Sequence, residues 1–350
     1  MKRFQLKTKE NLKNKMERKF KLEDFDYEVP KELIAQKHVM PRDRARMMVV
    51  KDKIYHKHFY ELPEYLEKGD VIVINNTRVI PAKIFGRKET GGKVELLLIK
   101  KISSQEYECL ISGKNIKENS NLIFDNFKAK ILSKENGKFI VKFEKDINDF
   151  IYKRGEMPLP HYIKEKLENK EEYQTVYSKK IGAIAAPTAG LHFTKKLINE
   201  LKSKGVIFAE ITLHVSLGTF RPVHNIETHK MDEEYYEVSE EAAEIINKAF
   251  ENEKNIFAVG TTSVKTLETV ADQNGLIQPK TGFSDLFIKP GYNFKTKIKA
   301  MITNFHIPKS TLIMMVCAFG GYERVMNAYR EAIKEKYKFY SFGDSMLLFR

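Results

Sequence analysis

The sequence has no tryptophan and only two cysteines among its 350 residues. Cys109 and Cys317 lie far apart, so neither a disulfide framework nor a zinc-binding cysteine pair is expected, and a reducing cytoplasm suits the chain. No run approaches the roughly 18 apolar residues that a transmembrane helix requires. The basic segment 1–20 is not followed by an apolar segment, so no secretory signal is expected. These absences favour a cytoplasmic protein that contacts no membrane.

Acidic side chains are outnumbered, with 47 Asp and Glu against 61 Lys and Arg, which gives a formal net charge of +14. The segment 1–20 holds eight basic and two acidic side chains, and the rest of the chain is still basic by 8. A basic body suits a polyanionic partner such as nucleic acid. The alternative is that lysine is simply abundant in the source organism.

The middle of the chain predicts a separate β-rich domain. Residues 1–20 are polar and basic, and we expect them to form an arm or a marginal helix. From residue 69 short β-type runs follow one another without a convincing helix, which predicts a small β-barrel or sandwich. The runs span 71–74, 79–80, 94–99, 107–111, 128–132 and 139–143. We therefore predict a β-barrel over 69–154, inserted into a larger domain formed by 21–68 and 155–350.

After residue 155 helical and strand patterns alternate. Helices are expected at 195–203, 240–253, 263–271, 311–319 and 323–336, and strands at 206–215, 256–259, 285–288, 299–303 and 345–349. Such alternation predicts an α/β (mixed α+β) domain with a mixed or mainly parallel sheet. In that architecture ligands bind at the carboxyl ends of the strands.

A stretch of small residues from Gly182 to Gly190 stands out, because backbone can approach a ligand closely where side chains are small. It contains Thr188 and is followed by His192, which comes just before a helix expected to be capped by Thr194. A helix N-terminus offers N–H donors to an anionic group. The alternative is a tight strand-to-helix turn that needs small residues for packing.

Two further strand-to-helix junctions carry polar residues. Gly260, Thr261 and Thr262 follow an apolar strand and can cradle an anion, although hydroxyl residues there are also ordinary helix caps. Thr303, Asn304, His306 and Lys309 lie between an apolar strand and an apolar helix, where each must be paired or used. No P-loop and no G-x-G-x-x-G motif follows any strand, so neither a nucleoside triphosphate nor NAD is predicted.

Histidines are the candidate proton carriers, because imidazole titrates near neutral pH. His214 lies at the end of an apolar strand, before a Gly-Thr-Phe-Arg turn, and a lone histidine there is more often a hydrogen-bonded core residue. The five histidines at 192, 214, 224, 229 and 306 show none of the usual zinc-ligand spacings, so no metal site is expected.

Basic residues of the β-rich segment are candidates for binding nucleic acid. Arg78, Lys83, Arg87 and Lys88 are expected to contribute to a basic face there. The alternative is that they are the water-facing side chains of an antiparallel sheet.

Taken in order, these segments closely resemble the S-adenosylmethionine:tRNA ribosyltransferase-isomerase family of queuosine biosynthesis. The resemblance covers nearly the whole chain after position 20, and seven motifs in register make it specific. The seven stretches are 25–46, 76–83 (Asn-Thr-Arg-Val-Ile-Pro-Ala-Lys), 92–98, 173–194, 214–222, 259–268 (Val-Gly-Thr-Thr-Ser-Val-Lys-Thr-Leu-Glu) and 287–311, and 337–347 matches as well. The chain departs from the family at Met231-Asp-Glu-Glu, where His-Ser-Glu is common, and at Lys265, where the family commonly has arginine, which leaves the role of that side chain open.

The resemblance implies that the chain transfers the ribosyl part of S-adenosylmethionine onto 7-aminomethyl-7-deazaguanine at the wobble position of a tRNA. The ribosyl unit is isomerised, which gives epoxyqueuosine and releases adenine and methionine. It also implies a larger domain of mixed sheet and helices with an inserted β-barrel, and no metal. We expect no cofactor beyond the consumed S-adenosylmethionine, and a monomer.

This chemistry needs a base beside the acidified ribose carbon and a proton donor for the departing adenine. His192, His306 and His214 are the candidate catalytic residues, and their individual roles stay open. Candidate substrate-binding residues are Thr188, Gly190, Gly260, Thr261, Thr262, Asn304 and Lys309. Two other functions remain possible at this point, a non-catalytic tRNA-binding module and a methyltransferase. The clustered polar residues disfavour the first, and the lack of a glycine-rich strand-turn-helix near the start disfavours the second.

Overall fold

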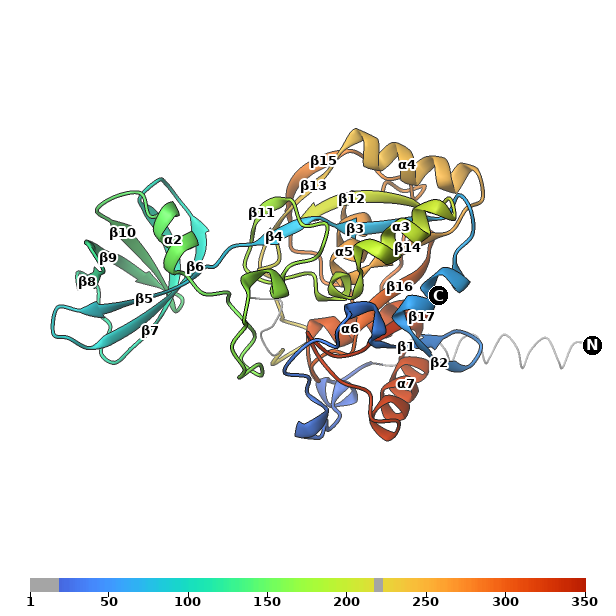
Figure 1. Ribbon diagram of the computed structural model, residues 1–350, viewed down its shortest axis with the longest axis horizontal. Helices are drawn as coiled ribbons and strands as arrows, with labels where there is room; N and C mark the ends of the chain where they lie inside the picture. Colours follow the sequence, from blue (N-terminus) through green and yellow to red (C-terminus); the bar gives the residue numbers. More distant parts are fainter. Residues whose placement is uncertain (1–18, 217–222) are drawn as a thin grey trace, which may run out of the picture.

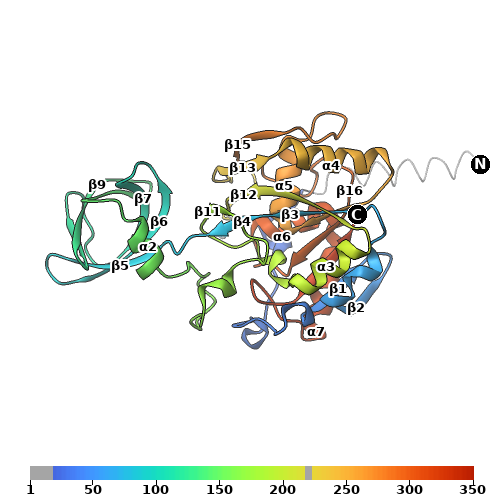
Figure 2. The same ribbon diagram turned by 45° about the horizontal axis from the view of Figure 1, so that its top comes forward.

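A computed structural model describes residues 19–216 and 223–350. The predicted arm over 1–20 and the turn at 218–221 lie outside these residues, except for positions 19 and 20. The chain forms a larger body built on a nine-stranded mixed sheet and a closed six-stranded barrel that projects from one end of it (Figures 1 and 2). The predicted combination of a mixed α/β domain and a β-barrel is therefore confirmed.

The nine-stranded sheet has the order β15-β13-β12-β3-β14-β16-β17-β1-β2, and its four central strands, β12, β3, β14 and β16, are parallel. The outer pairs β12–β13, β13–β15, β16–β17 and β1–β2 are antiparallel. The strands are β1 (Arg46–Val50), β2 (Ile54–His58), β3 (Val71–Asn75), β12 (Ile207–Leu213), β13 (Glu234–Val238), β14 (Ile256–Val259), β15 (Lys280–Ser284), β16 (Ile298–Asn304) and β17 (Ser345–Phe349).

Helices cover both faces of this sheet. One face packs against α4 (Glu240–Glu251), α5 (Gly260–Val270), α6 (Thr311–Gly320) and α7 (Tyr322–Lys334), whose apolar residues join one core cluster. The other face packs against α3 (Lys195–Ser203) and η4 (Phe59–Tyr65). Side chains alternate along each strand, so Val71 and Val73 enter the first core while Ile72 and Ile74 enter the second. No helix among residues 19–216 and 223–350 is long and apolar enough to cross a membrane.

The barrel has the strand order β10-β7-β6-β5-β8-β9 and its own apolar core. Its strands are β5 (Lys83–Lys88), β6 (Lys93–Lys101), β7 (Glu106–Ser112), β8 (Asn121–Phe124), β9 (Phe127–Glu135) and β10 (Lys138–Phe143), and α2 (Asn148–Arg154) packs beside them. A two-stranded parallel sheet of β4 (Thr77–Val79) and β11 (Lys180–Ala183) lies where the chain passes between barrel and body. The remaining elements are short 3₁₀ turns, η1 (Leu22–Phe25), η2 (Lys31–Leu33), η3 (Arg42–Arg44), η5 (Lys170–Tyr173) and η6 (Thr188–His192).

Three strand predictions are wrong. The run at 79–80, expected in the barrel, overlaps β4, which pairs with β11 outside the barrel. The run at 71–74, expected in the β-rich segment that starts at 69, is β3 in the middle of the large sheet. Every residue of β3 is buried, and an apolar run buried on both faces is typical of a central parallel strand. The strand expected at 285–288 lies instead at Lys280–Ser284. Ile288 is buried and Leu286 and Phe287 are partly buried, so these apolar residues pack against the core without forming a strand.

Candidate active site

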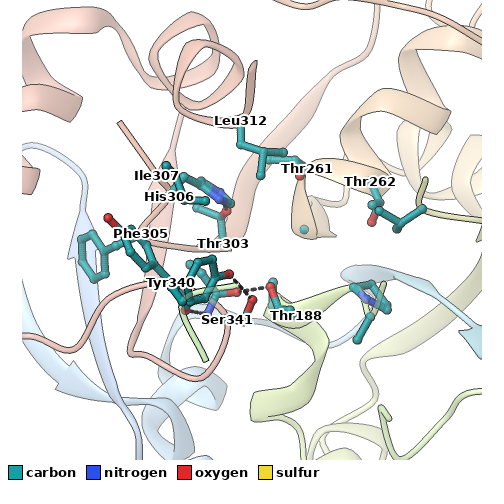
Figure 3. A pocket seen from close by; sticks show the side chains of 17 residues that line it. Thr188, Thr261, Thr262, Thr303, Phe305, His306, Ile307, Leu312, Tyr340 and Ser341 are labelled. Atoms are coloured by element: carbon teal, nitrogen blue, oxygen red, sulfur yellow. Dashed lines mark hydrogen bonds between the residues drawn. The ribbon is translucent and has the colours of Figure 1, made fainter. Parts of the chain in front are cut away.

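A cavity opens at the carboxyl edge of the parallel strands, where β14 leads into α5 and β16 ends (Figure 3). Its volume is about 550 Å³ when the open mouth is included. Five other segments complete its wall: the small-residue stretch with η6, the residue after His214, the loop before β17, Tyr162, and Leu312 at the start of α6. The polar residues that line it are Tyr162, Thr188, Thr261, Thr262, Thr303, Asn304, His306, Tyr340 and Ser341.

Gly260 allows the strand to turn directly into the helix. Its φ of +84° is a conformation that side-chain-bearing residues rarely adopt, and an added Cβ would lie 3.3 Å from the hydroxyl of Thr262. Val259, the residue before α5, makes no side-chain cap hydrogen bond to the helix. The first turn of α5 lines the cavity with Thr261 and Thr262.

Hydrogen bonds of Asn304, the last residue of β16, join the small-residue stretch to the loop before β17. The Thr188 hydroxyl donates to Oδ1 of Asn304 over 3.0 Å, and Nδ2 of Asn304 donates to Nε2 of His192 over 3.2 Å. The same amide group donates to the carbonyl of Tyr340 over 3.3 Å. Asn304 thus fixes the small-residue stretch and the loop before β17 against the end of β16.

His192 lies behind this chain and not on the cavity wall. Only 4% of its surface is exposed, and its ring centre is 5.1 Å from that of Phe59. Burial, with smaller contributions from His38 and Arg42, lowers the pKa of His192 to about 3. A histidine in the loop before a helix is expected to be partly exposed, but this expectation is wrong for His192, which belongs to η6 and is buried. A neutral imidazole at this place can accept the Asn304 hydrogen bond.

His306 lines the cavity, and it is partly buried. Its Nε2 lies 2.7 Å from the hydroxyl of Thr303, and its backbone N–H donates to the hydroxyl of Tyr329 over 3.0 Å. Burial lowers the pKa of His306 to about 3, so the imidazole is neutral near pH 7. In the tautomer that donates from Nε2–H to Thr303, Nδ1 carries a lone pair that can accept a proton.

His214 occupies a different hollow, the cleft between barrel and body, whose volume is about 1630 Å³ with its open space. Its Nδ1 lies 2.7 Å from the Thr77 hydroxyl, and its ring stacks on Tyr235 at 5.2 Å. Burial lowers the pKa of His214. The structure therefore brings His192 and His306 to one region but places His214 apart from them. Val215 lines both the cleft and the cavity, so the two hollows are neighbours.

Two predicted substrate-binding residues lie outside the cavity wall. A Cβ at Gly190 would meet the Tyr177 hydroxyl at 2.0 Å, so glycine is needed here for packing. Lys309 pairs with Asp26 at 2.6 Å, and this hydrogen bond raises its pKa.

The four predicted tRNA-binding residues lie on β4 and β5, at the entrance to the barrel. Arg78 pairs with Glu171 and donates to the Ser178 hydroxyl over 2.9 Å. Lys83 pairs with Glu95 at 2.9 Å, and Lys88 donates to the carbonyl of Lys114 over 2.9 Å. Arg87 is exposed. Arg78 and Lys83 are thus partly neutralised by neighbouring carboxylates.

Sequence reasoning missed Tyr162, Tyr340 and Ser341 as cavity residues. Tyr340 has a φ of +70°, which is uncommon for an aromatic residue and is often found at functional sites. No pattern in the sequence reveals such a conformation. Among residues 19–216 and 223–350, no group of three or more His, Cys, Asp or Glu residues could hold a metal ion.

Comparisons with known proteins agree with this architecture. A family model described as queuosine biosynthesis protein matches residues 22–348. Similar proteins named S-adenosylmethionine:tRNA ribosyltransferase-isomerase occur in Natranaerobius thermophilus, 50% identical over 341 residues, and Carboxydothermus hydrogenoformans, 50% identical over 338 residues. Each alignment covers 94% of this chain and 99% of the relative. The crystal structure of S-adenosylmethionine tRNA ribosyltransferase from Thermotoga maritima has a TM-score of 0.53 and 39% identity, and the match covers 93% of this chain and 99% of that one. The chain therefore belongs to the queuosine biosynthesis protein family.

Proposed function

We propose that this chain is an S-adenosylmethionine:tRNA ribosyltransferase-isomerase, the activity for which its relatives are named. It is a transferase of queuosine biosynthesis that moves the ribosyl part of S-adenosylmethionine to a tRNA and isomerises it. The observation that carries this proposal is the match of family and relatives along nearly the whole chain. The cavity, where polar residues of five segments converge, is the place we propose for the reaction.

The acceptor in this proposal is the aminomethyl group of 7-aminomethyl-7-deazaguanine at the tRNA wobble position. The products are epoxyqueuosine-tRNA, adenine and methionine. No cofactor and no metal takes part, because S-adenosylmethionine itself supplies the ribosyl group. We also propose that the protein acts as a monomer in the cytoplasm.

His306 is the residue that we propose as the base. The positive sulfonium of S-adenosylmethionine acidifies the neighbouring ribose carbon, so a neutral base can remove a proton from it. His306 lines the cavity, and its hydrogen bond with Thr303 fixes the orientation of the ring. His192 acts as a positioning residue for Asn304, because it is buried behind the wall.

The tRNA is proposed to approach over the cleft between barrel and body. This cleft adjoins the cavity through Val215 and contains Lys100, whose ammonium lies 5.9 Å from the ring centre of the exposed Phe283. Cationic and aromatic side chains together suit phosphates and unstacked bases. Arg78, Lys83, Arg87 and Lys88 are proposed to add cationic contacts along β4 and β5, and His214 with Tyr235 offers a second ring face.

Product analysis tests the activity. Purified protein is incubated with S-adenosylmethionine and a tRNA that carries 7-aminomethyl-7-deazaguanine, and the small molecules are separated by chromatography. Adenine and methionine in equal amounts support ribosyl transfer. S-adenosylhomocysteine instead indicates a methyltransferase, and tRNA binding without any product indicates a binding module.

A further inference from the structure

A narrow slot continues from the cavity between the first turns of α5 and α6. Thr261, Thr262 and Leu312 line both hollows, so the slot and the cavity share a wall. The volume of the slot is about 340 Å³ with its open mouth. Its far wall is apolar and includes Leu286, Phe287 and Met315.

Two hydroxyl groups in the slot have no hydrogen-bond partner among residues 19–216 and 223–350. They are Oγ1 of Thr262 and Oγ1 of Thr311, and both atoms are buried. The Thr311 residue is only 4% exposed. A buried hydroxyl without a partner is unfavourable, and native proteins rarely leave one unless a ligand or water completes it. Two such groups in one slot indicate a ligand with hydrogen-bond acceptors.

The surroundings of these hydroxyls favour negative charge. Both threonines lie in the first turn of a helix of ten or more residues, where N–H groups lack partners within the helix. The ammonium of Lys265 also lines the slot and is 2.9 Å from Oε2 of Glu234, with both side chains almost fully buried. An ammonium has three N–H donors. The ammonium of Lys265 makes only this one hydrogen bond to the described residues.

We propose that this slot binds the α-carboxylate of the methionyl part of S-adenosylmethionine, with Thr262 and Thr311 as hydroxyl donors. The inference rests on the proposed function, since the carboxylate is the only anionic group of that substrate. A carboxylate accepts hydrogen bonds only, so it can take those of the Thr262 and Thr311 hydroxyls, while the Lys265 ammonium offsets the negative charge of Glu234 in the same wall. The apolar wall then contacts the methylene groups of the same amino-acid moiety, and the ribosyl group points back into the cavity toward His306.

Equilibrium binding without tRNA tests the slot directly. The ligands are S-adenosylmethionine and decarboxylated S-adenosylmethionine, which lacks only the carboxylate. The variants are Thr262→Val and Thr311→Val, which remove the hydroxyl and keep the shape. Thr175→Val is the matched control, because the Thr175 hydroxyl is also buried without a partner among the described residues but lies outside both hollows.

We expect wild type to bind S-adenosylmethionine at least tenfold more tightly than the decarboxylated compound. T262V and T311V should each weaken S-adenosylmethionine binding by about 10-fold, since hydrogen bonds to a charged group are the strong ones. Their affinity for the decarboxylated compound should stay close to that of wild type, and T175V should match wild type for both ligands. Melting temperatures without ligand should not fall in T262V or T311V, because no internal hydrogen bond is lost.

Equal binding of the two ligands by wild type would overturn the inference. It would also be overturned if T262V and T311V weakened both ligands alike, or if T175V showed the same loss. Wild-type turnover is measured in parallel by release of adenine and methionine. Failure of that turnover counts against the proposed function, whereas turnover with unchanged ligand discrimination in the variants counts against the slot alone.

Discussion

The buried neutral state of His192 predicts a measurable loss of stability in acid. In the folded protein the pKa of His192 is lowered to about 3 from an ordinary value of 6.5, chiefly by burial. Between these two values the unfolded chain binds a proton at this residue and the folded chain does not. Stability contributed by His192 is therefore complete above pH 6.5 and falls as the pH drops toward 3.

The size of this effect follows from the width of the window. Each pH unit below the unfolded-state pKa lowers the free energy of unfolding by about 1.4 kcal/mol. Moving from pH 7 to pH 5 therefore lowers it by about 2 kcal/mol through His192 alone. Other histidines add to the total in wild type, notably His306 and His38, whose pKa values are lowered to about 3 and about 4. The difference between wild type and a His192 variant isolates the share of this one residue.

Urea unfolding of wild type and His192→Gln at pH 7 and pH 5 measures the contribution of His192 to this pH dependence. Glutamine does not titrate and its amide can accept the Asn304 hydrogen bond. The free energy of unfolding of the variant should therefore fall by about 2 kcal/mol less than that of wild type between pH 7 and pH 5. His161→Gln is the control, because His161 is exposed, and it should behave as wild type. An H192Q protein that loses as much stability as wild type would refute the buried neutral state.

Four other outcomes follow from the structure. His306→Ala should lower single-turnover rates by about 10²- to 10⁴-fold if it removes the proton-accepting group, and a rate near wild type would reject His306 as the base. Lys265→Met should lower the free energy of unfolding in urea by about 3–5 kcal/mol, because it breaks the buried ion pair of Lys265 and Glu234, and a neutral effect would contradict the importance of the pair. tRNA affinity should fall by about 10³-fold or more between 50 and 200 mM salt if six phosphates are contacted, whereas a flat profile would reject the electrostatic contribution. Turnover should survive exhaustive chelation, and a loss that one divalent ion restores, with the tRNA still folded, would show a metal requirement.

Local patterns predicted most of the elements of the larger body. The helix at 195–203 and the strand at 345–349 are found at the predicted residues. The helix was predictable because its apolar positions repeat with helical spacing between a cap, Thr194, and a stop, Gly205. The sequence could not predict which sheet β3 joins, because a short apolar run has the same pattern in a barrel strand and in a buried parallel strand. Its partners, β12 and β14, come much later in the chain, after the whole barrel, so only the folded chain assigns it.

Convergence of the site was predictable from topology alone. β14 and β16 are parallel neighbours, so the residues after them meet at one edge, and Thr261, Thr262, Asn304 and His306 do line one cavity. The positions of individual side chains were not predictable. Lys309 follows shortly after His306 yet turns away to pair with Asp26, because direction within an irregular loop depends on contacts that the local sequence does not encode.

The hydrogen bonds of Asn304 determine what the cavity can offer a ribose. Both N–H groups of its amide donate hydrogen bonds, one to His192 and one to the carbonyl of Tyr340. Its oxygen accepts a hydrogen bond from the hydroxyl of Thr188. Asn304 therefore has no N–H left for a ligand. The single O–H of Thr188 already donates to Asn304, so Thr188 can only accept a hydrogen bond from a donor in the cavity. Ribose hydroxyls are such donors, and the buried neutral His192 sustains this arrangement, because a protonated imidazole could not accept from Asn304.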